Sequence, residues 1–162
     1  MRCAVATSLL AVSVIGQLLL PSRLLLVWNT TASIPIGLYA IQWASPARGD
    51  VLVTRLPREM ELVAVSRGIL APRTPVLKPV VAIAGDRVCR VGSAVYVNGR
   101  FAALARELDR RGQHMPVWRG CRRLRASQVF LLARHPQSFD SRYYGQLELH
   151  LARGIARPTL TF

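Results

Sequence analysis

The chain has 162 residues, 51% of them hydrophobic, and carries a formal net charge of +14 from 22 basic and 8 acidic side chains. This length leaves room for a domain with a sizeable core once an apolar N-terminal segment is set aside, so we expect one soluble domain. Lys78 is the only lysine, so arginine supplies every other basic side chain. Because a buried lysine can lose its proton whereas arginine stays charged, this lysine marks a position of interest.

The first segment of the chain is apolar. Residues 3–20 contain no charged side chain, and a second apolar stretch at residues 24–28 follows Arg23. A helix of the first length extends about 27 Å, close to the thickness of a bilayer's hydrocarbon core. We therefore predict an N-terminal membrane anchor at residues 1–28 and one soluble domain at residues 29–162. The alternative is a cleaved signal peptide, with cleavage after Ala32 leaving Ser33 as the new N-terminus.

Ser33 lies on a segment whose backbone is restricted. Pro35 fixes its own φ and biases Ile34 towards extended conformations, while Gly37 permits a turn that other residues resist. Such a segment can hold one hydroxyl in one pose, as a catalytic nucleophile requires. Since serines near prolines and glycines are also ordinary loop residues, the rest of the chain has to supply a base.

The sequence after this segment predicts a hairpin and a helix. Residues 38–41 and 51–53 are strand-like and are separated by a turn-forming segment at residues 45–50, so we expect them to pair with one another. A short helix is expected to begin at Pro57-Arg58-Glu59, to end at Arg67-Gly68 and to lie over the core.

Residues 76–84 form a candidate buried strand in which Lys78 is the only charged residue. Desolvation disfavours the ammonium form of a lysine and lowers its pKa, which produces the neutral amine that a general base needs. Lys78 is therefore the candidate partner of the Ser33 hydroxyl.

The remaining sequence is predicted to be mainly β. Strands are expected at residues 88–91 and 94–97, followed by the hairpin turn Asn98-Gly99, and again at residues 129–132. A short helix is expected at residues 102–111.

Two of the cysteines, Cys89 and Cys121, lie in the predicted soluble domain, whereas Cys3 lies in the apolar run. In an oxidising compartment the two would suit a disulfide that closes a long loop, and in the cytosol they would be unrelated thiols. The histidines lack metal-ligand spacing, so we assign no metal site and no cofactor. They are His114, His135 and His150.

Several arginines beside Trp118 suggest a nucleic-acid interface: Arg119, Arg122, Arg123 and Arg125. Arginines are spread through the whole chain, however, aromatic residues between them are sparse, and no DNA-binding motif or glycine-rich phosphate loop accompanies them. Contact with anionic lipid headgroups beside an anchor accounts for the charge at least as well. We therefore do not expect nucleic acid as a partner.

Three segments together resemble the type I signal peptidases, specifically their TraF-like, pilin-processing conjugative branch. Residues 33–39, Ser-Ile-Pro-Ile-Gly-Leu-Tyr, are similar to the nucleophile box, and Lys78 with Gly85-Asp86 is similar to the lysine box. Residues 138–145, Ser-Phe-Asp-Ser-Arg-Tyr-Tyr-Gly, are similar to the third box and are the most specific of the three. The resemblance implies a mainly β catalytic domain with short helical insertions, on the periplasmic face of the bacterial inner membrane behind one transmembrane helix.

The resemblance also implies a role for each matching residue. It makes Ser33 the nucleophile and Lys78 its general base, with the Thr31 hydroxyl and the Ser33 backbone N–H as oxyanion donors. Ser138 matches a serine that orients the lysine. Asp140 and Arg142 match an ion pair that supports the site, and in the conjugative branch the aspartate is itself implicated in activity.

Departures from the housekeeping leader peptidases favour the conjugative branch. One residue fewer separates Ser33 from Pro35, Pro79 replaces a basic residue, and Ala84 replaces a proline. The branch implies a membrane-bound serine endopeptidase or transpeptidase whose substrate is a conjugative pilin precursor, released as a linear or a cyclic product. Components of a conjugative type IV secretion apparatus are further expected partners.

Alternatives remain at the level of the sequence. A general type I leader peptidase would use Ser33 and Lys78 on other substrates. A Ser-His-Asp site would use Ser33, His135 and Asp140 but would leave Lys78 without a role. A non-catalytic, membrane-tethered component of a secretion apparatus would need neither arrangement.

Overall fold

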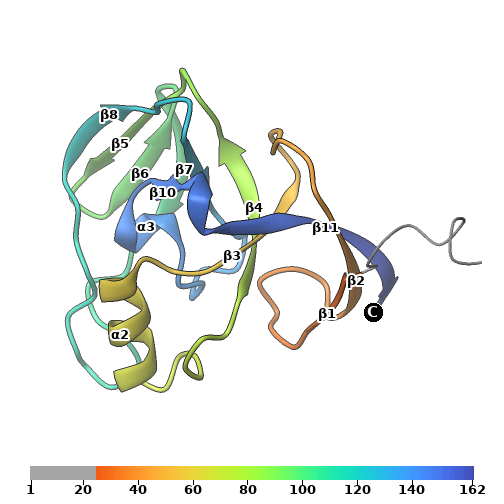
Figure 1. Cartoon of the computed structure of the whole chain (residues 1–162). Helices are drawn as coiled ribbons and strands as arrows, with labels where there is room; N and C mark the ends of the chain where they lie inside the picture. Colours follow the sequence, from red (N-terminus) through yellow and green to blue (C-terminus); the bar gives the residue numbers. More distant parts are fainter. Residues whose placement is uncertain (1–24) are drawn as a thin grey trace, which may run out of the picture.

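The computed structural model describes residues 25–162, and most of the predicted anchor lies outside the described residues. Two antiparallel β-sheets account for most of this part of the chain (Figure 1). The prediction of a mainly β domain with short helical segments is therefore confirmed. Between Leu25 and Phe162, no helix is long and apolar enough to cross a membrane.

The larger sheet of residues 25–162 has seven strands. In spatial order they are β1 (Leu25–Asn29), β2 (Gly37–Gln42), β11 (Ala152–Thr161), β3 (Val51–Thr54), β4 (Val76–Ala82), β9 (Gln128–Leu131) and β10 (Leu147–Glu148). Its central strands bury a cluster that includes Leu52, Leu131 and Ile155. In Figure 1, β11 runs across this sheet and ends beside β1 and β2.

The smaller sheet of the described chain has four strands. In spatial order they are β7 (Arg100–Leu104), β6 (Ala94–Val97), β5 (Arg87–Val91) and β8 (Gly120–Arg123). Asn98 and Gly99 connect β6 to β7 with φ angles of 50° and 79°, the positive values that a type I′ turn requires. Val88 and Val95 of this sheet pack with Phe130 of β9, so the two sheets share a core.

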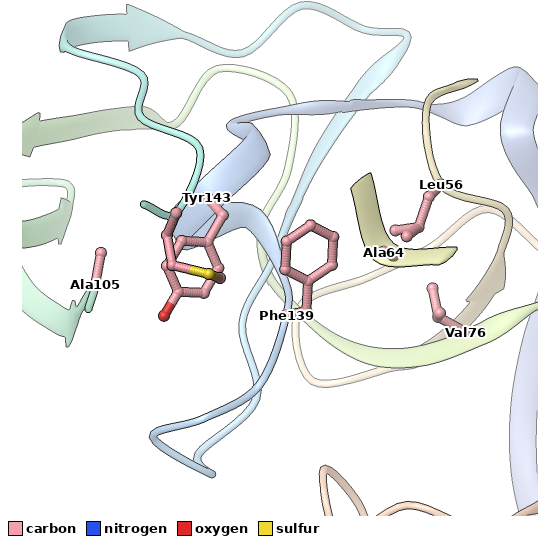
Figure 2. Close-up of a cluster of buried hydrophobic side chains, with 7 residues drawn as sticks. Leu56, Ala64, Val76, Ala105, Phe139 and Tyr143 are labelled. Atoms are coloured by element: carbon pink, nitrogen blue, oxygen red, sulfur yellow. The ribbon is translucent and has the colours of Figure 1, made fainter. Parts of the chain in front are cut away.

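Short helices cover one end of the domain. Their bounds are α2 (Arg58–Ser66), α3 (Ser141–Tyr144) and the 3₁₀ helix η1 (Leu149–Leu151). Ala64 of α2 packs with Leu56 and Val76 on one side of Phe139, while Tyr143 of α3 lies on the other side (Figure 2). The Phe139 and Tyr143 rings stack with their centroids 5.7 Å apart. This cluster holds α2 and the segment before α3 together, and α2 lies where the sequence predicted a helix.

The predicted pairing of residues 38–41 with residues 51–53 is wrong. Both strands form, as β2 and β3, but β11 lies between them and pairs with each. Gly37 makes this close approach feasible, because a Cβ at that position would clash with the Leu160 carbonyl group. The turn at residues 45–50 therefore connects two strands that are not neighbours, and no local signal reveals the strand inserted between them.

Two further boundaries differ from the prediction. The helix expected at residues 102–111 is wrong: the chain forms β7 instead, because the turn at Asn98 and Gly99 returns it alongside β6. Backbone pairing there outweighs the helix propensity of the alanine and leucine residues. At the start of the described chain, β1 pairs with β2 along its whole length, so the range predicted for the anchor overlaps a strand from Leu25 onward.

Cys89 of β5 and Cys121 of β8 lie directly opposite each other and are joined by a disulfide that spans a sequence separation of 32. We predict that the double substitution Cys89→Ala/Cys121→Ala lowers the free energy of unfolding by about 3 to 4 kcal/mol, because a bond across a loop of this length restricts the unfolded chain. Urea denaturation of the full-length protein in detergent measures the loss. Cys3→Ala removes a thiol outside this bond and is the matched control. Finding Cys89 and Cys121 both as free thiols in protein from its native compartment would contradict the bond.

Candidate functional site

The segment between β1 and β2 carries Ser33 and is folded around one buried side chain. Asn29, the last residue of β1, is only 5% exposed. Its side-chain amide donates to the backbone carbonyl oxygens of Thr31, Ile34 and Pro35 at 2.8, 3.2 and 3.0 Å. The Tyr39 hydroxyl donates to the Pro35 carbonyl oxygen at 2.7 Å. Hydrogen bonds to side chains thus hold the Ser33 segment, in addition to the restriction that Pro35 imposes.

Lys78 of β4 reaches Ser33 from the larger sheet. Its Nζ lies 2.6 Å from Ser33 Oγ and 2.9 Å from Ser138 Oγ. The lysine is only 6% exposed, and its strand β4 pairs with β3 on one side and with β9 on the other. Ser33, Lys78 and Ser138 come from segments far apart in the sequence, and the fold brings all three predicted residues together.

The surroundings of Lys78 favour the neutral amine. Burial lowers the pKa of Lys78 from its ordinary value of 10.5 to about 8, because the ammonium form loses its hydration. The Asp140 carboxylate opposes this effect, and the Arg142 guanidinium adds to it. A neutral Nζ within hydrogen-bond distance of Ser33 Oγ can accept the hydroxyl proton, so the pair has the geometry of a base and a nucleophile.

A buried ion pair holds the third predicted segment in place behind the lysine. Arg142 donates from Nε to Asp140 Oδ1 at 2.7 Å and from Nη2 to Asp140 Oδ2 at 3.0 Å, and the two side chains are 3% and 0% exposed. Asp140 also accepts the Ala133 N–H, and Arg142 donates to the Ala133 carbonyl oxygen at 2.6 Å. These bonds tie α3 to the chain that leaves β9, and they position Ser138 beside Lys78.

Thr31 lies at the site, but its hydroxyl is already engaged. Its Oγ1 donates to Asn29 Oδ1 at 3.0 Å, and its backbone N–H donates to the same oxygen at 3.2 Å. The Ser33 backbone N–H, by contrast, has no acceptor among residues 25–162. The Ser33 amide is therefore available to a substrate oxygen, whereas Thr31 would first have to release Asn29.

The structure does not assemble the alternative Ser-His-Asp site. His135 Nδ1 accepts the Gln137 N–H at 3.2 Å, and Asp140 is bonded to Arg142 instead of to a histidine. Both positions that such a site requires are thus occupied by other interactions. Ser33 is hydrogen-bonded to Lys78.

Three arginines near Trp118 serve intramolecular contacts. Arg122 stacks over the Trp118 ring at 5.6 Å, Arg123 donates to the Gly85 carbonyl oxygen, and Arg125 pairs with Glu148 at 3.3 Å. These three guanidinium groups therefore contact other parts of the domain. Their presence is explained in part by these contacts and does not require a nucleic acid as partner.

Ser33 and Lys78 open into a cleft of about 640 Å³, within the range of small-ligand sites. The end of α2 forms one wall, and the chain after β7 forms another. The cleft is lined, besides the two central residues, by Thr31, Ala32, Arg67, Gly68, Ile69, Leu70, Val76, Arg106, Leu108, Asp109, Arg110, Arg111, Met115, His135, Gln137, Ser138, Phe139 and Tyr143. Sequence reasoning missed Asn29 and the arginines of this cleft. A polar residue just after an apolar run was the only signal for Asn29, and the even spread of arginine masked the others.

Comparison with known proteins identifies relatives over nearly the whole chain. The sequence profile of the family described as "Signal peptidase, peptidase S26" matches residues 1–160. A probable conjugal transfer protein TraF from Sinorhizobium fredii is 34% identical over 146 residues, which cover 83% of this chain and 76% of that protein. A plasmid transfer protein TraF from Escherichia coli is 29% identical over 148 residues, which cover 83% of this chain and 82% of that protein.

Among solved structures, a signal peptidase I from Enterococcus faecalis V583 is similar with a TM-score of 0.42 and 18% sequence identity. The similarity covers 70% of this chain and 98% of that one.

The buried lysine makes a pH-dependent stability test possible. We predict that Lys78→Met raises the free energy of unfolding at pH 7 by about 1 kcal/mol. The lowered pKa of folded Lys78 costs the protein about 3 kcal/mol of stability, and this cost is fully present below pH 8. Loss of the two hydrogen bonds to Ser33 and Ser138 offsets about 2 kcal/mol of the gain. As the pH rises from about 8 towards 10.5, the folded protein loses this penalty and the advantage of methionine shrinks.

Urea denaturation of the full-length protein in detergent at pH 7 and pH 10 measures this difference. Arg87→Met replaces an exposed cation on β5 and is the matched control, with no expected pH-dependent change. A gain for Lys78→Met that is equal at both pH values would contradict a lowered lysine pKa.

The ion pair behind the lysine provides a second test. Asp140→Asn is expected to lower the free energy of unfolding by about 3 to 5 kcal/mol, because the buried Arg142 loses its counter-charge. Asp50→Asn, which removes the carboxylate that pairs with the half-exposed Arg157 at 3.0 Å, is expected to cost less than about 1 kcal/mol. Thermal or urea unfolding compares the two variants, and equal losses would show that the buried pair contributes no more than a surface pair.

Proposed function

The chain belongs to the peptidase S26 family of signal peptidases, in its TraF-like branch, and we propose that it processes a conjugative pilin precursor as a membrane-bound serine endopeptidase or transpeptidase. Family membership implies a serine peptidase. The observation that carries the proposal is the 2.6 Å separation of Lys78 Nζ from Ser33 Oγ in a buried setting. The TraF names of the relatives support a role in conjugation.

Acylation would begin with proton transfer from the Ser33 hydroxyl to neutral Lys78 Nζ. Ser33 Oγ attacks the carbonyl carbon of the scissile bond, and the negative charge develops on the carbonyl oxygen. The Ser33 N–H, which has no acceptor in the part of the chain that the structure describes, is suited to stabilise this charge. Thr31 can contribute if its hydroxyl turns from Asn29 to the substrate. When the C–N bond breaks, the Lys78 ammonium returns its proton to the departing amine, and an acyl ester on Ser33 remains.

Deacylation repeats these steps in reverse with a second nucleophile. Water attack, with Lys78 accepting its proton, releases a linear carboxylic acid. Attack by the α-amino group of the same pilin forms a new peptide bond and releases a cyclic chain. Both routes return Ser33 to its hydroxyl form, so the two products differ by one water molecule.

The proposed location is the bacterial inner membrane, with residues 1–28 as anchor and the domain on the periplasmic face. Six of the exposed large apolar side chains support a position of this end near the membrane, because they lie on or next to β1, β2 and the end of β11 (Figure 1). They are Leu25, Leu26, Trp28, Ile36, Leu160 and Phe162. The Cys89–Cys121 disulfide agrees with an oxidising compartment. The inner membrane and the conjugative type IV secretion apparatus are the proposed surroundings.

A non-catalytic assembly component is the main alternative from another functional class. Such a protein gains nothing from a lysine that is buried at a cost in stability beside a serine, whereas a peptidase needs that arrangement. A general leader peptidase shares the chemistry, and the conjugative relatives favour the pilin.

We predict that Ser33→Ala and Lys78→Arg each abolish processing of a co-expressed conjugative pilin precursor. The first variant lacks the attacking oxygen, and the second replaces the base with a guanidinium that stays protonated. Intact-mass measurement of the pilin provides the readout. A trimmed linear chain indicates hydrolysis, and a product one water molecule lighter indicates cyclisation.

Ser127→Ala, which removes an exposed hydroxyl bonded to Glu148, is the matched control and should process normally. Each variant is first checked for membrane insertion and for protease resistance of the folded domain. If folded and inserted Ser33→Ala and Lys78→Arg proteins still process the pilin, the Ser-Lys mechanism is wrong.

A further inference from the structure

The cleft that contains Ser33 is strongly cationic. Its lining includes one acidic residue, Asp109, and a group of arginines: Arg67, Arg106, Arg110 and Arg111. A peptide that reaches Ser33 therefore passes a positively charged cleft wall. Because the cleft is partly enclosed, dissolved salt screens these charges less than it screens charges on an open surface.

Asp109 offsets only part of this positive charge, because its single carboxylate pairs with Arg67 while four arginines line the cleft. Oδ1 accepts the backbone N–H groups of Arg111 and Gln113 at 2.8 and 2.9 Å, and Oδ2 lies 3.4 Å from Arg67 Nη1. These bonds close a tight turn that also includes a backbone bond from Asp109 N–H to the Gln113 carbonyl oxygen at 2.9 Å. Asp109 thus shapes the loop that presents the neighbouring arginines.

The arginines divide into two pairs. Arg67 donates to the His114 carbonyl oxygen at 2.9 Å and Arg110 donates to Gln137, so these two guanidinium groups bind the cleft walls to each other. For the guanidinium groups of Arg106 and Arg111, no carboxylate or hydrogen-bond acceptor is found within residues 25–162. They are the cations that remain available to a ligand.

The backbone of both available arginines is well fixed. Arg106 N–H donates to the Tyr143 hydroxyl at 3.2 Å, and the preceding Ala105 is buried in the cluster of Figure 2. The Asp109 turn holds Arg111. A guanidinium group presents a planar set of N–H donors that matches the two oxygens of a carboxylate.

From this arrangement we propose that Arg106 and Arg111 form a carboxylate-binding subsite in the cleft that contains Ser33, which selects peptide substrates with an acidic side chain or a free C-terminal carboxylate. The proposal rests on the proposed function only in taking a peptide as the occupant of the cleft. It adds a charge requirement that Ser33 and Lys78 by themselves do not impose.

Binding to the full-length Ser33→Ala protein in detergent tests the subsite without turnover. The probes are five-residue peptides measured by NMR titration: one of alanine with two glutamates and blocked ends, its twin with two glutamines, and the glutamine peptide with a free C-terminal carboxyl group. The carboxylate-bearing peptides should bind at least about threefold more tightly than the blocked glutamine peptide at low ionic strength, and salt should reduce the difference. Preference for only one of them identifies which source of carboxylate the subsite takes.

The variant Arg106→Gln/Arg111→Gln should remove this preference. The matched control Arg87→Gln/Arg100→Gln removes the same charge from exposed positions on β5 and β7 outside the cleft and should keep it. The proposal is overturned if neither carboxylate-bearing peptide binds better than the blocked glutamine peptide, or if both double variants lose the preference equally. Because no catalysis is involved, a failure here is distinguishable from a failure of pilin processing.

Discussion

Burial of one amine beside one hydroxyl is the constraint on which this structure depends. Lys78 Nζ has lost most of its water and lies 2.6 Å from Ser33 Oγ. Desolvation brings the pKa of Lys78 to about 8, so the neutral amine is more accessible near physiological pH than in an ordinary lysine. This environment destabilises the folded state below that pH, and the surrounding structure has to compensate.

The elements around Lys78 supply stabilising contacts that offset the cost of burying its amine. The buried Asp140–Arg142 pair holds α3 and Ser138 behind the lysine, while the apolar cluster around Phe139 fixes the same segment from its other side. The Asn29 side-chain amide donates hydrogen bonds to the backbone of the Ser33 segment and so holds that segment, which leads directly into β2. Ser33 therefore lies at one edge of the larger sheet and Lys78 on β4 in its interior, so the distance between the two side chains depends on the strands between them.

The same sheet gives the domain two chemically different regions. One end, formed by β1, β2 and the end of β11, exposes large apolar side chains, whereas the cleft wall after β7 is cationic. The proposed active site between this apolar end and this cationic wall suits a substrate that is embedded in a membrane and carries acidic groups. In this proposal a substrate leaves the membrane near the anchor, reaches Ser33 and places its acidic group at the arginine subsite.

The sequence by itself determined which side chains are the candidates for the site, because single residues carry that signal. The only lysine in a buried strand, the stiff segment after Ser33, and the run from Ser138 to Gly145 were readable without any contact information. Tertiary structure alone decided the insertion of β11 between β2 and β3, the strand β7 where part of a helix at residues 102–111 was expected, and the contacts of Asn29. These features depend on pairing and burial between residues distant in the chain, for which local propensity and spacing provide no signal.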